Sequence, residues 1–311
     1  VILIHNDKET SRMLTSNCRK MGWASRSIQE KVLDDGEKLH ATALWRPWES
    51  IKKIKLENVN STNTYLLEKN YPHGTLVVAE NQTEGRGQRE NSWIQLEGGW
   101  CGSWTIDLKD TSAGVIQAKT GLAILETIAA LSSLELPTFD LLSMAKFSKK
   151  NIFIKWPNDI LLKNKKIAGI LSEAKTQGND TKCVVGIGCN ISGKEFEINE
   201  ILPNATSLNS IFKNEIELNK WESIIHASMA SKFQNHELFD LKNDSDELIN
   251  WWLSMEPFCK GNKIMIDSIE YFITGVFSDG SAKIIDSNYK LKSQKKYEDS
   301  FNLKWKPKSF N

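Results

Sequence analysis

The stretch that decides the fold covers residues 151–174 and reads NIFIKWPNDILLKNKKIAGILSEA. Residues 151–156 are mostly β-branched or aromatic, and the Pro-Asn-Asp triplet at 157–159 is typical of a turn. Two further apolar runs follow, separated by the polar Asn-Lys pair at 164–165. The pattern predicts strand, turn, strand, tight hairpin and strand. Lys155, Asp159 and Lys166 of this stretch would then be fixed on rigid β structure.

The chain around this stretch predicts a mixed α+β fold. Ser61 is a good N-cap for a helix that runs to about Lys69. Residues 76–79, 104–108 and 183–191 are typical of strands. A long helix is predicted by apolar residues spaced by three and four positions, namely Val115, Ala118, Leu122, Leu125 and Ala129. Together these elements predict a mainly antiparallel sheet with helices on one face, and residues 137–150 as a loop.

The C-terminal third has a different sequence pattern, in which an amphipathic helix is followed by short apolar runs. Asn219 and Glu222 resemble a capping pair at the start of an amphipathic helix. Short apolar runs follow at 263–266, 271–277 and 282–285, with an Asp-Gly turn between the last two. Several short strands close to the C-terminus predict a small β-barrel.

Residues 1–50 carry no sustained hydrophobic period, and we expect a loosely ordered or non-native leader there. Residues 27–33 could form one helix. No second helix with base-reading positions follows at the short spacing that a helix-turn-helix requires, so DNA binding is not expected.

Composition narrows the function classes. The chain of 311 residues has 40 basic and 39 acidic side chains, so its charge does not suggest nucleic acid as a partner. No run approaches about 18 consecutive apolar residues, so no membrane span is expected. The odd number of cysteines, without metal-type clustering, favours reduced thiols in a cytoplasmic protein. These cysteines are Cys18, Cys101, Cys183, Cys189 and Cys259.

Five segments, in this order along the chain, resemble the biotin–protein ligase family. They are Ser61-Thr62-Asn63, the Gly/Arg segment 82–87, the KWPND and KIAGIL pair at 155–171, GIGCN at 186–190 and LPNATSL at 202–208. The resemblance covers about residue 51 to the C-terminus. It implies a fold like that of class II aminoacyl-tRNA synthetases over 51–258 and an SH3-like β-barrel over 259–311, with 1–50 unassigned.

The resemblance also implies a reaction in two steps. Biotin and ATP would form biotinyl-adenylate, and biotin would then pass to one lysine of a biotin carboxyl carrier domain of a carboxylase. The first step needs fixed cations where negative charge builds up, and Lys166 and Lys155 match the family positions. Asp159 matches the carboxylate that would accept the proton of the acceptor lysine.

Binding residues are likewise implied by family position. The biotin-binding set is Ser61, Thr62, Gln82, Gly85, Arg86, Lys166 and Gly169. The ATP-binding set is Arg86, Gln88, Arg89, Trp93, Asn158 and Asn190. The family's Mg²⁺ accompanies ATP, and Asn158 is a suitable oxygen donor for it. Simpler interpretations compete with these roles. Ser61 could do no more than cap a helix, and Asp159 could do no more than form a turn.

Two departures from the family pattern leave alternatives open. Glu90 stands where the family loop has glycine, and segment 96–102 differs from the usual strand start. A lipoate or octanoate ligase or transferase of the same fold is one alternative, and a degenerate biotin-binding protein without turnover is another. The identity of the carrier and the choice between monomer and homodimer are not decided by the sequence.

Overall fold

The computed structural model describes most of the chain. The described residues are 1–5, 7–32, 38–88, 91–107, 112–131, 152–177, 180–193, 198, 201–210, 212, 215–234, 244–259, 263–266, 268–286, 291–293 and 304–306. The predicted loop at 137–150 lies outside them.

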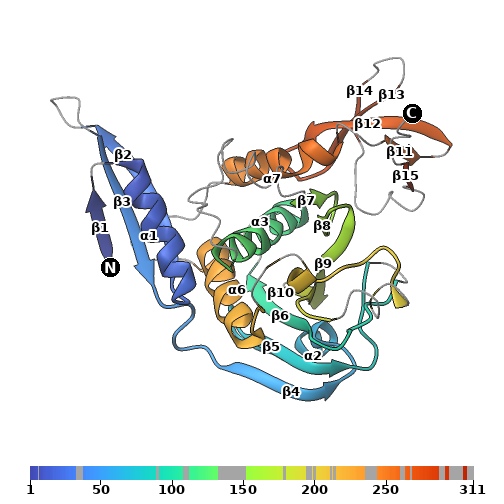
Figure 1. Cartoon of the computed structure of the whole chain (residues 1–311), viewed down its shortest axis with the longest axis horizontal. Helices are drawn as coiled ribbons and strands as arrows, with labels where there is room; N and C mark the ends of the chain where they lie inside the picture. Colours follow the sequence, from blue (N-terminus) through green and yellow to red (C-terminus); the bar gives the residue numbers. More distant parts are fainter. Residues whose placement is uncertain are drawn as a thin grey trace.

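The centre of the molecule is a seven-stranded sheet in the order β4-β5-β6-β10-β9-β8-β7 (Figure 1). All neighbouring strands are antiparallel except β4 and β5. The strands are β4 (Lys53–Val59), β5 (Leu76–Gln82), β6 (Gly99–Asp107), β7 (Ile152–Lys155), β8 (Asp159–Leu162), β9 (Lys165–Gln177) and β10 (Asp180–Asn190). The strand, turn, strand, hairpin and strand predicted for 151–174 are therefore confirmed.

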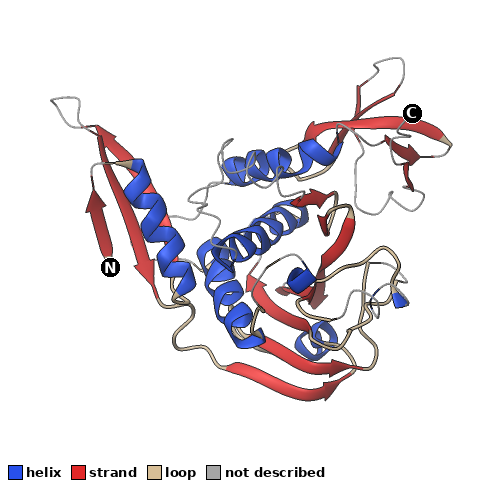
Figure 2. Ribbon diagram, viewed as in Figure 1, coloured by secondary structure: helices blue, strands red, loops and turns tan. Residues whose placement is uncertain are grey.

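Helices cover both faces of this sheet (Figure 2). The long helices α3 (Ala113–Leu131) and α6 (Leu218–Phe233) share one apolar core with the sheet. The short helix α2 (Thr62–Glu68) packs on the opposite face, where Leu66 contacts Val77 and Val184. The expectation that all helices lie on one face is therefore wrong, because Val77 of β5 and Val184 of β10 form a second apolar patch that α2 covers. The α+β class is confirmed.

Helix α3 is apolar almost all round. Its Gly114–Leu131 window is long and apolar enough to cross a membrane, and 89% of it is buried inside the fold, as in the core helix of a globular protein.

Helix α6 begins one residue before the predicted cap. Its N-cap is Glu217, which makes no side-chain capping bond, so the predicted Asn219–Glu222 pair is wrong. Glu222 is instead buried, and its carboxylate lies 3.0 Å from Lys53 Nζ and 3.6 Å from Lys55 Nζ.

The described part of residues 1–45 contains regular structure, contrary to the expected loose leader. Strands β1 (Ile2–His5), β2 (Ala24–Val32) and β3 (Lys38–Trp45) form an antiparallel sheet in the order β1-β3-β2, and α1 (Lys8–Lys20) packs on it. Asp7 caps α1 by accepting from Thr10 N at 2.6 Å.

This N-terminal unit packs against α3 and α6 through buried polar contacts. Arg19 is 3% exposed, and its guanidinium lies 3.3 Å from the Glu126 carboxylate on α3. Glu126 also pairs with Lys232 of α6 at 2.8 Å. Trp45 Nε1 donates to Gln234 Oε1 at 3.0 Å. The order of residues 1–50 thus comes from partners far along the chain, which local periodicity does not reveal.

The C-terminal part joins α7 (Asp244–Cys259) to a five-stranded antiparallel sheet of order β14-β13-β12-β11-β15. Its strands are β11 (Lys263–Ile266), β12 (Ile269–Val276), β13 (Ala282–Asp286), β14 (Leu291–Ser293) and β15 (Lys304–Lys306). Trp156 Nε1, in the β7–β8 turn, donates to Gly280 O at 3.4 Å. The β12–β13 turn therefore contacts the segment that leads into Asn158 and Asp159. The domain boundaries at 50 and 258 stay predictions.

Gly114, at the start of α3, allows the close approach of the β12–β13 turn. A Cβ atom there would lie 2.1 Å from Asp279 O and 2.5 Å from Gly280 Cα. Because backbone must move to relieve this clash, we expect Gly114→Ala to lower the free energy of unfolding by about 1–3 kcal/mol. Chemical denaturation measures it. The control is Gly275→Ala, whose Cβ would meet only the flexible Lys283 side chain at 3.3 Å. Equal losses in the two variants would contradict the prediction.

His226 of α6 should make stability depend on pH. Burial, with a smaller contribution from the Lys53 charge, lowers the pKa of His226 to about 3. Its Nδ1 accepts from Trp104 Nε1 at 3.1 Å, so the folded protein holds the neutral ring. The unfolded chain has the ordinary pKa near 6.5 and binds the proton first. The stability contributed by neutral His226 is therefore complete above about pH 6.5 and is lost as pH falls toward 3.

We expect protonation of His226 in the unfolded chain to lower the free energy of unfolding by about 1.4 kcal/mol per pH unit below pH 6. Urea unfolding of the parent and His226→Gln, which keeps an acceptor for Trp104, measures it at several pH values. The free-energy difference between the two proteins should shrink as pH falls. Parallel pH profiles would show that His226 does not titrate in this way.

Candidate active site

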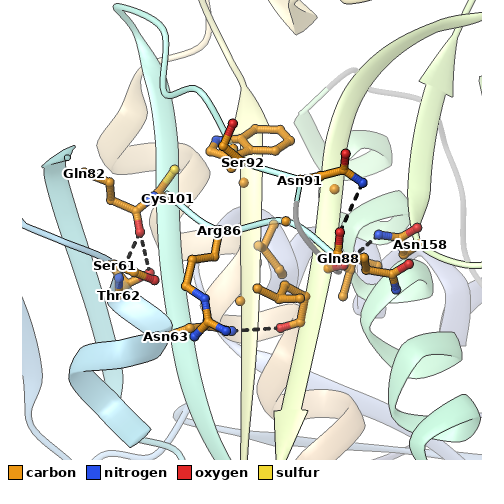
Figure 3. Close-up of a pocket in the computed structure, with 18 of the residues that line it drawn as sticks. Ser61, Thr62, Asn63, Gln82, Arg86, Gln88, Asn91, Ser92, Cys101 and Asn158 are labelled. Atoms are coloured by element: carbon orange, nitrogen blue, oxygen red, sulfur yellow. Dashed lines mark hydrogen bonds between the residues drawn. The ribbon is translucent and has the colours of Figure 1, made fainter. Parts of the chain in front are cut away.

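A cavity of about 340 Å³ lies on the α2 face of the central sheet. Its floor is formed by β9 and β10, and the segment after β5 runs over it (Figure 3). The lining residues are Ser61, Thr62, Asn63, Gln82, Arg86, Gly87, Gln88, Asn91, Ser92, Trp93, Cys101, Asn158, Asp159, Lys166, Gly169, Ile170, Leu171, Gly186, Ile187 and Gly188.

One end of the cavity carries neutral hydrogen-bonding groups. Gln82 Oε1 accepts from Thr62 N at 2.9 Å and lies 3.2 Å from Thr62 Oγ1 (Figure 3). Behind them, Ser103 Oγ lies 2.7 Å from Thr62 Oγ1 and 2.6 Å from Asn63 Oδ1. Ser61 caps α2 through Thr64 N. These contacts fix neutral amide and hydroxyl groups in a buried setting, suited to a neutral polar ligand.

The other end carries charge. Lys166 Nζ lies 2.6 Å from Asp159 Oδ1, and Lys155 Nζ lies 3.7 Å from Asp159 Oδ2. Strand pairing explains the cluster, because Asp159 is paired with Lys155 on β7 and with Gly169 on β9. Two cations and one carboxylate leave a net positive charge beside the cavity, which favours an anionic ligand group.

Trp93 packs over the floor between these two ends. Gly188 on β10 and Gly169 on β9 are cross-strand partners. A Cβ on Gly188 would lie 2.3 Å from the indole, so only glycine allows this packing. Lys166 Nζ lies 5.4 Å from the centroid of the Trp93 ring, within range of a cation–π interaction. The middle of the cavity is thus aromatic and flat-floored.

Cys101 on β6 also lines the cavity. Burial raises the pKa of its thiol to about 12, although Trp93 and Gln82 hydrogen bonds oppose the shift. The thiol is therefore protonated at neutral pH and is a poor nucleophile.

Most of the predicted site residues meet at this cavity. Those that line it are Ser61, Thr62, Gln82, Arg86, Gln88, Trp93, Asn158, Asp159, Lys166 and Gly169. Lys155 reaches the cavity only through Asp159. Gly85 accepts a backbone bond from Trp93 N at 2.8 Å and shapes the segment above the floor. Arg89 and Glu90 lie outside the described residues.

Asn190 does not line this cavity, and its contact with ATP stays a prediction. It is 2% exposed and is not among the lining residues, and its Nδ2 donates to Thr206 O at 3.2 Å. This bond ties the end of β10 to the segment 202–208. That segment in turn supports Lys166, because Lys166 N donates to Asn204 O at 2.7 Å. In the structure, Asn190 therefore acts on the backbone around the site.

Several lining residues were not predicted. Asn63, Asn91, Ser92 and Cys101 all contribute polar side chains. Asn63 stands inside the quoted Ser61-Thr62-Asn63 segment, so its position was a usable signal. Cys101 lies in the segment that departs from the family pattern, and only the register of β6 places it at the cavity.

No metal centre is evident in the described part of the chain, where no three His, Cys, Asp or Glu side chains are grouped to hold an ion. Asn158 Nδ2 donates to Ile170 O at 3.0 Å, which leaves its amide oxygen as the available donor atom. A single amide oxygen suits Mg²⁺ that arrives with a nucleotide, since such ions take most ligands from phosphate and water.

The comparisons with known proteins agree with this geometry. Residues 56–190 match the model of the Biotin/lipoate A/B protein ligase family. The bifunctional ligase/repressor BirA of Bacillus subtilis is 32% identical over 165 residues, which are 52% of this chain and 46% of BirA. The biotin–[acetyl-CoA-carboxylase] ligase of Paracoccus denitrificans is 34% identical over 131 residues, 42% of this chain and 49% of the relative.

A solved structure extends the likeness beyond the matched domain. The biotin protein ligase of Aquifex aeolicus in complex with biotin and ATP has a TM-score of 0.64 at 25% identity, and the match covers 82% of this chain and 99% of that one. The chain spans about half the length of the curated relatives it matches. The fold is thus that of the biotin protein ligases.

Proposed function

We propose that this chain is a biotin–protein ligase that activates biotin with ATP and transfers it to a lysine of a carrier domain. The observation that supports this proposal most strongly is a single cavity with three parts. It has a neutral hydrogen-bonding end, an aromatic middle and a cationic end. Biotin has the matching sequence of groups: a neutral ureido ring, an apolar body and a carboxylate.

At the neutral end, Thr62 and Gln82 would bind the ureido group, with Ser61 beside them. Because Gln82 Oε1 accepts from Thr62 N, its Nε2 remains as a donor for a ligand carbonyl. The protonated Cys101 thiol and the Trp93 indole would contact the apolar body.

At the charged end, Lys166 would bind the biotin carboxylate and the α-phosphate of ATP together. The carboxylate oxygen attacks the α-phosphorus, the bond to the bridging oxygen breaks and pyrophosphate leaves. Negative charge builds on the α-phosphate oxygens in the transition state, where a fixed ammonium group is most effective. Lys155 adds a second positive charge beside Asp159.

ATP would extend from Lys166 past the segment above the floor. Gln88 and Trp93 line that part of the cavity, and Arg89 follows Gln88 in the sequence. Arg86 lies nearer to α2, where it pairs with Glu173. Asn158 would contribute an oxygen to Mg²⁺, whose chemistry when bound is to neutralise the triphosphate. Asn190 would support the site through Thr206 and the backbone near Lys166, and its direct contact with ATP stays a prediction.

In the second step the acceptor lysine must lose a proton before its nitrogen attacks the carbonyl of biotinyl-adenylate. Asp159 would accept that proton as AMP leaves, because its carboxylate lies at the same end of the cavity as Lys166. The acceptor would belong to the biotin carrier domain of a carboxylase, as the names of the relatives suggest.

Equilibrium binding tests the choice of ligand. Isothermal titration of the full chain with biotin, lipoate and octanoate should give heat-detected binding with biotin alone at micromolar concentrations. Thr62→Val should weaken biotin binding, since the hydroxyl and its partners are lost at the neutral end. Tighter binding of octanoate or lipoate than of biotin would favour the lipoate or octanoate alternative.

The cellular setting belongs to the same proposal. The five cysteines are free and buried, which suits a reducing, cytoplasmic compartment. That the chain does not bind DNA stays a prediction.

A further inference from the structure

Glu173 lies just outside the cavity on its floor strand β9. It follows Gly169 and Leu171 at two-residue steps, so all three point to the α2 face of the sheet. Its side chain is 19% exposed. Sequence reasoning assigned it no role, and the mechanism above does not use it.

Both carboxylate oxygens of Glu173 are engaged. Arg86 Nη2 lies 2.7 Å from Oε1, and Asn63 Nδ2 donates to Oε2 at 2.8 Å. The Arg86 side chain extends from its segment toward Asn63 (Figure 3). Its other terminal nitrogen is 3.4 Å from Thr64 Oγ1. One carboxylate thus joins a cavity-lining arginine to a cavity-lining asparagine.

Asn63 gives this arrangement a rigid base. It is 3% exposed, and its Nδ2 also donates to Leu171 O at 3.1 Å while its Oδ1 lies 2.6 Å from Ser103 Oγ. A Cβ on Gly186 would lie 2.2 Å from Asn63 Oδ1, so the amide lies directly on β10. The sheet and α2 therefore fix Asn63, and Asn63 fixes Glu173.

We propose that Glu173 is a positioning residue that holds the Arg86 guanidinium at the edge of the cavity, where the substrates bind. Arginine has many rotamers, and ordering it at the moment of binding would cost conformational entropy. The ion pair with Glu173 already orders the Arg86 side chain in the free protein, so its guanidinium N–H groups are oriented before the substrates bind. The kinetic part of this inference rests on the proposed ligase function.

The first test uses the substrate-free chain. Trypsin can cut the Arg86–Gly87 bond only after Arg86 has left Glu173. Glu173→Gln should raise the rate of cleavage at this bond about threefold to fivefold, the range expected when a partly exposed ion pair is lost. Mass spectrometry identifies the bond. The control is Glu57→Gln, an exposed glutamate of β4, which should leave the rate unchanged. An unchanged rate in Glu173→Gln would overturn the proposal.

The second test is steady-state pyrophosphate exchange. Glu173→Ala should raise KM for biotin or ATP about threefold to fivefold with little change in kcat, and Glu173→Asp should recover part of the loss. Combining Glu173→Ala with Arg86→Ala should add nothing beyond Arg86→Ala alone. A lower KM in Glu173→Ala would mean that Glu173 competes with the substrate for Arg86, and additive losses would separate the two residues. If the parent exchanges no pyrophosphate, the proposed function fails, and the cleavage test decides the role of Glu173 by itself.

Discussion

Replacing Lys166 with alanine is expected to lower the rate of biotin-dependent pyrophosphate exchange about 10²–10³-fold, the usual effect of removing one preorganised donor to a developing negative charge. Lys166 Nζ is held by Asp159 at 2.6 Å and lies near Trp93, so its position is set before any substrate binds. Its side chain is 35% exposed, and we therefore expect the fold to survive the change.

The comparison should use Lys175→Ala as its control, because Lys175 is an exposed lysine of the same strand β9. Thermal unfolding of all three proteins shows whether folding is intact. Exchange by a folded Lys166→Ala protein at the parent rate would remove Lys166 from the chemistry.

Replacing Asp159 with asparagine should affect the second step most. We expect the transfer of biotin from preformed biotinyl-adenylate to the carrier lysine to fall about 10²–10³-fold, as is typical when a general base is removed. Asparagine keeps the shape and can still accept a hydrogen bond from Lys166, so pyrophosphate exchange should fall much less. A difference between the two steps is the signature of a proton acceptor.

Single-turnover transfer to a purified biotin carrier domain measures this effect. Asp107→Asn is the matched control, since Asp107 is an exposed aspartate at the end of β6. If Asp159→Asn slows exchange and transfer equally, Asp159 acts by orienting Lys166 instead of accepting a proton.

The parts of the fold that follow from the sequence are those with local signals. The alternation and turn residues of 151–174 predict the strands β7, β8 and β9, and Ser61 predicts the start of α2. The three- and four-residue spacing of apolar side chains predicts α3. In each case the signal lies within the element itself.

The N-terminal unit was not predictable in this way. Arg19 is buried because Glu126, 107 residues away, provides its charge partner. Trp45 and Trp48 belong to the same core as α3 and the central sheet. Such partners are found only when the chain is folded, so a search for local periodicity misses the unit.

The candidate site shows the same division. Family position predicted that Lys166, Asp159, Thr62 and Gln82 belong to one site. All four line one cavity, because the motif spacing follows the sheet register. Position alone could not tell that Asn190 bonds to Thr206, or that Glu173 pairs with Arg86. These depend on side-chain direction and on contacts between segments.

The central claim is that biotin and the α-phosphate of ATP react in one cavity. Its most direct test is the biotin-dependent exchange of radiolabelled pyrophosphate into ATP by the full chain. We expect exchange that requires both biotin and Mg²⁺ and that lipoate and octanoate do not support. A chain that binds biotin with micromolar affinity yet exchanges no pyrophosphate would be a biotin-binding protein without turnover, and the proposed ligase activity would be wrong.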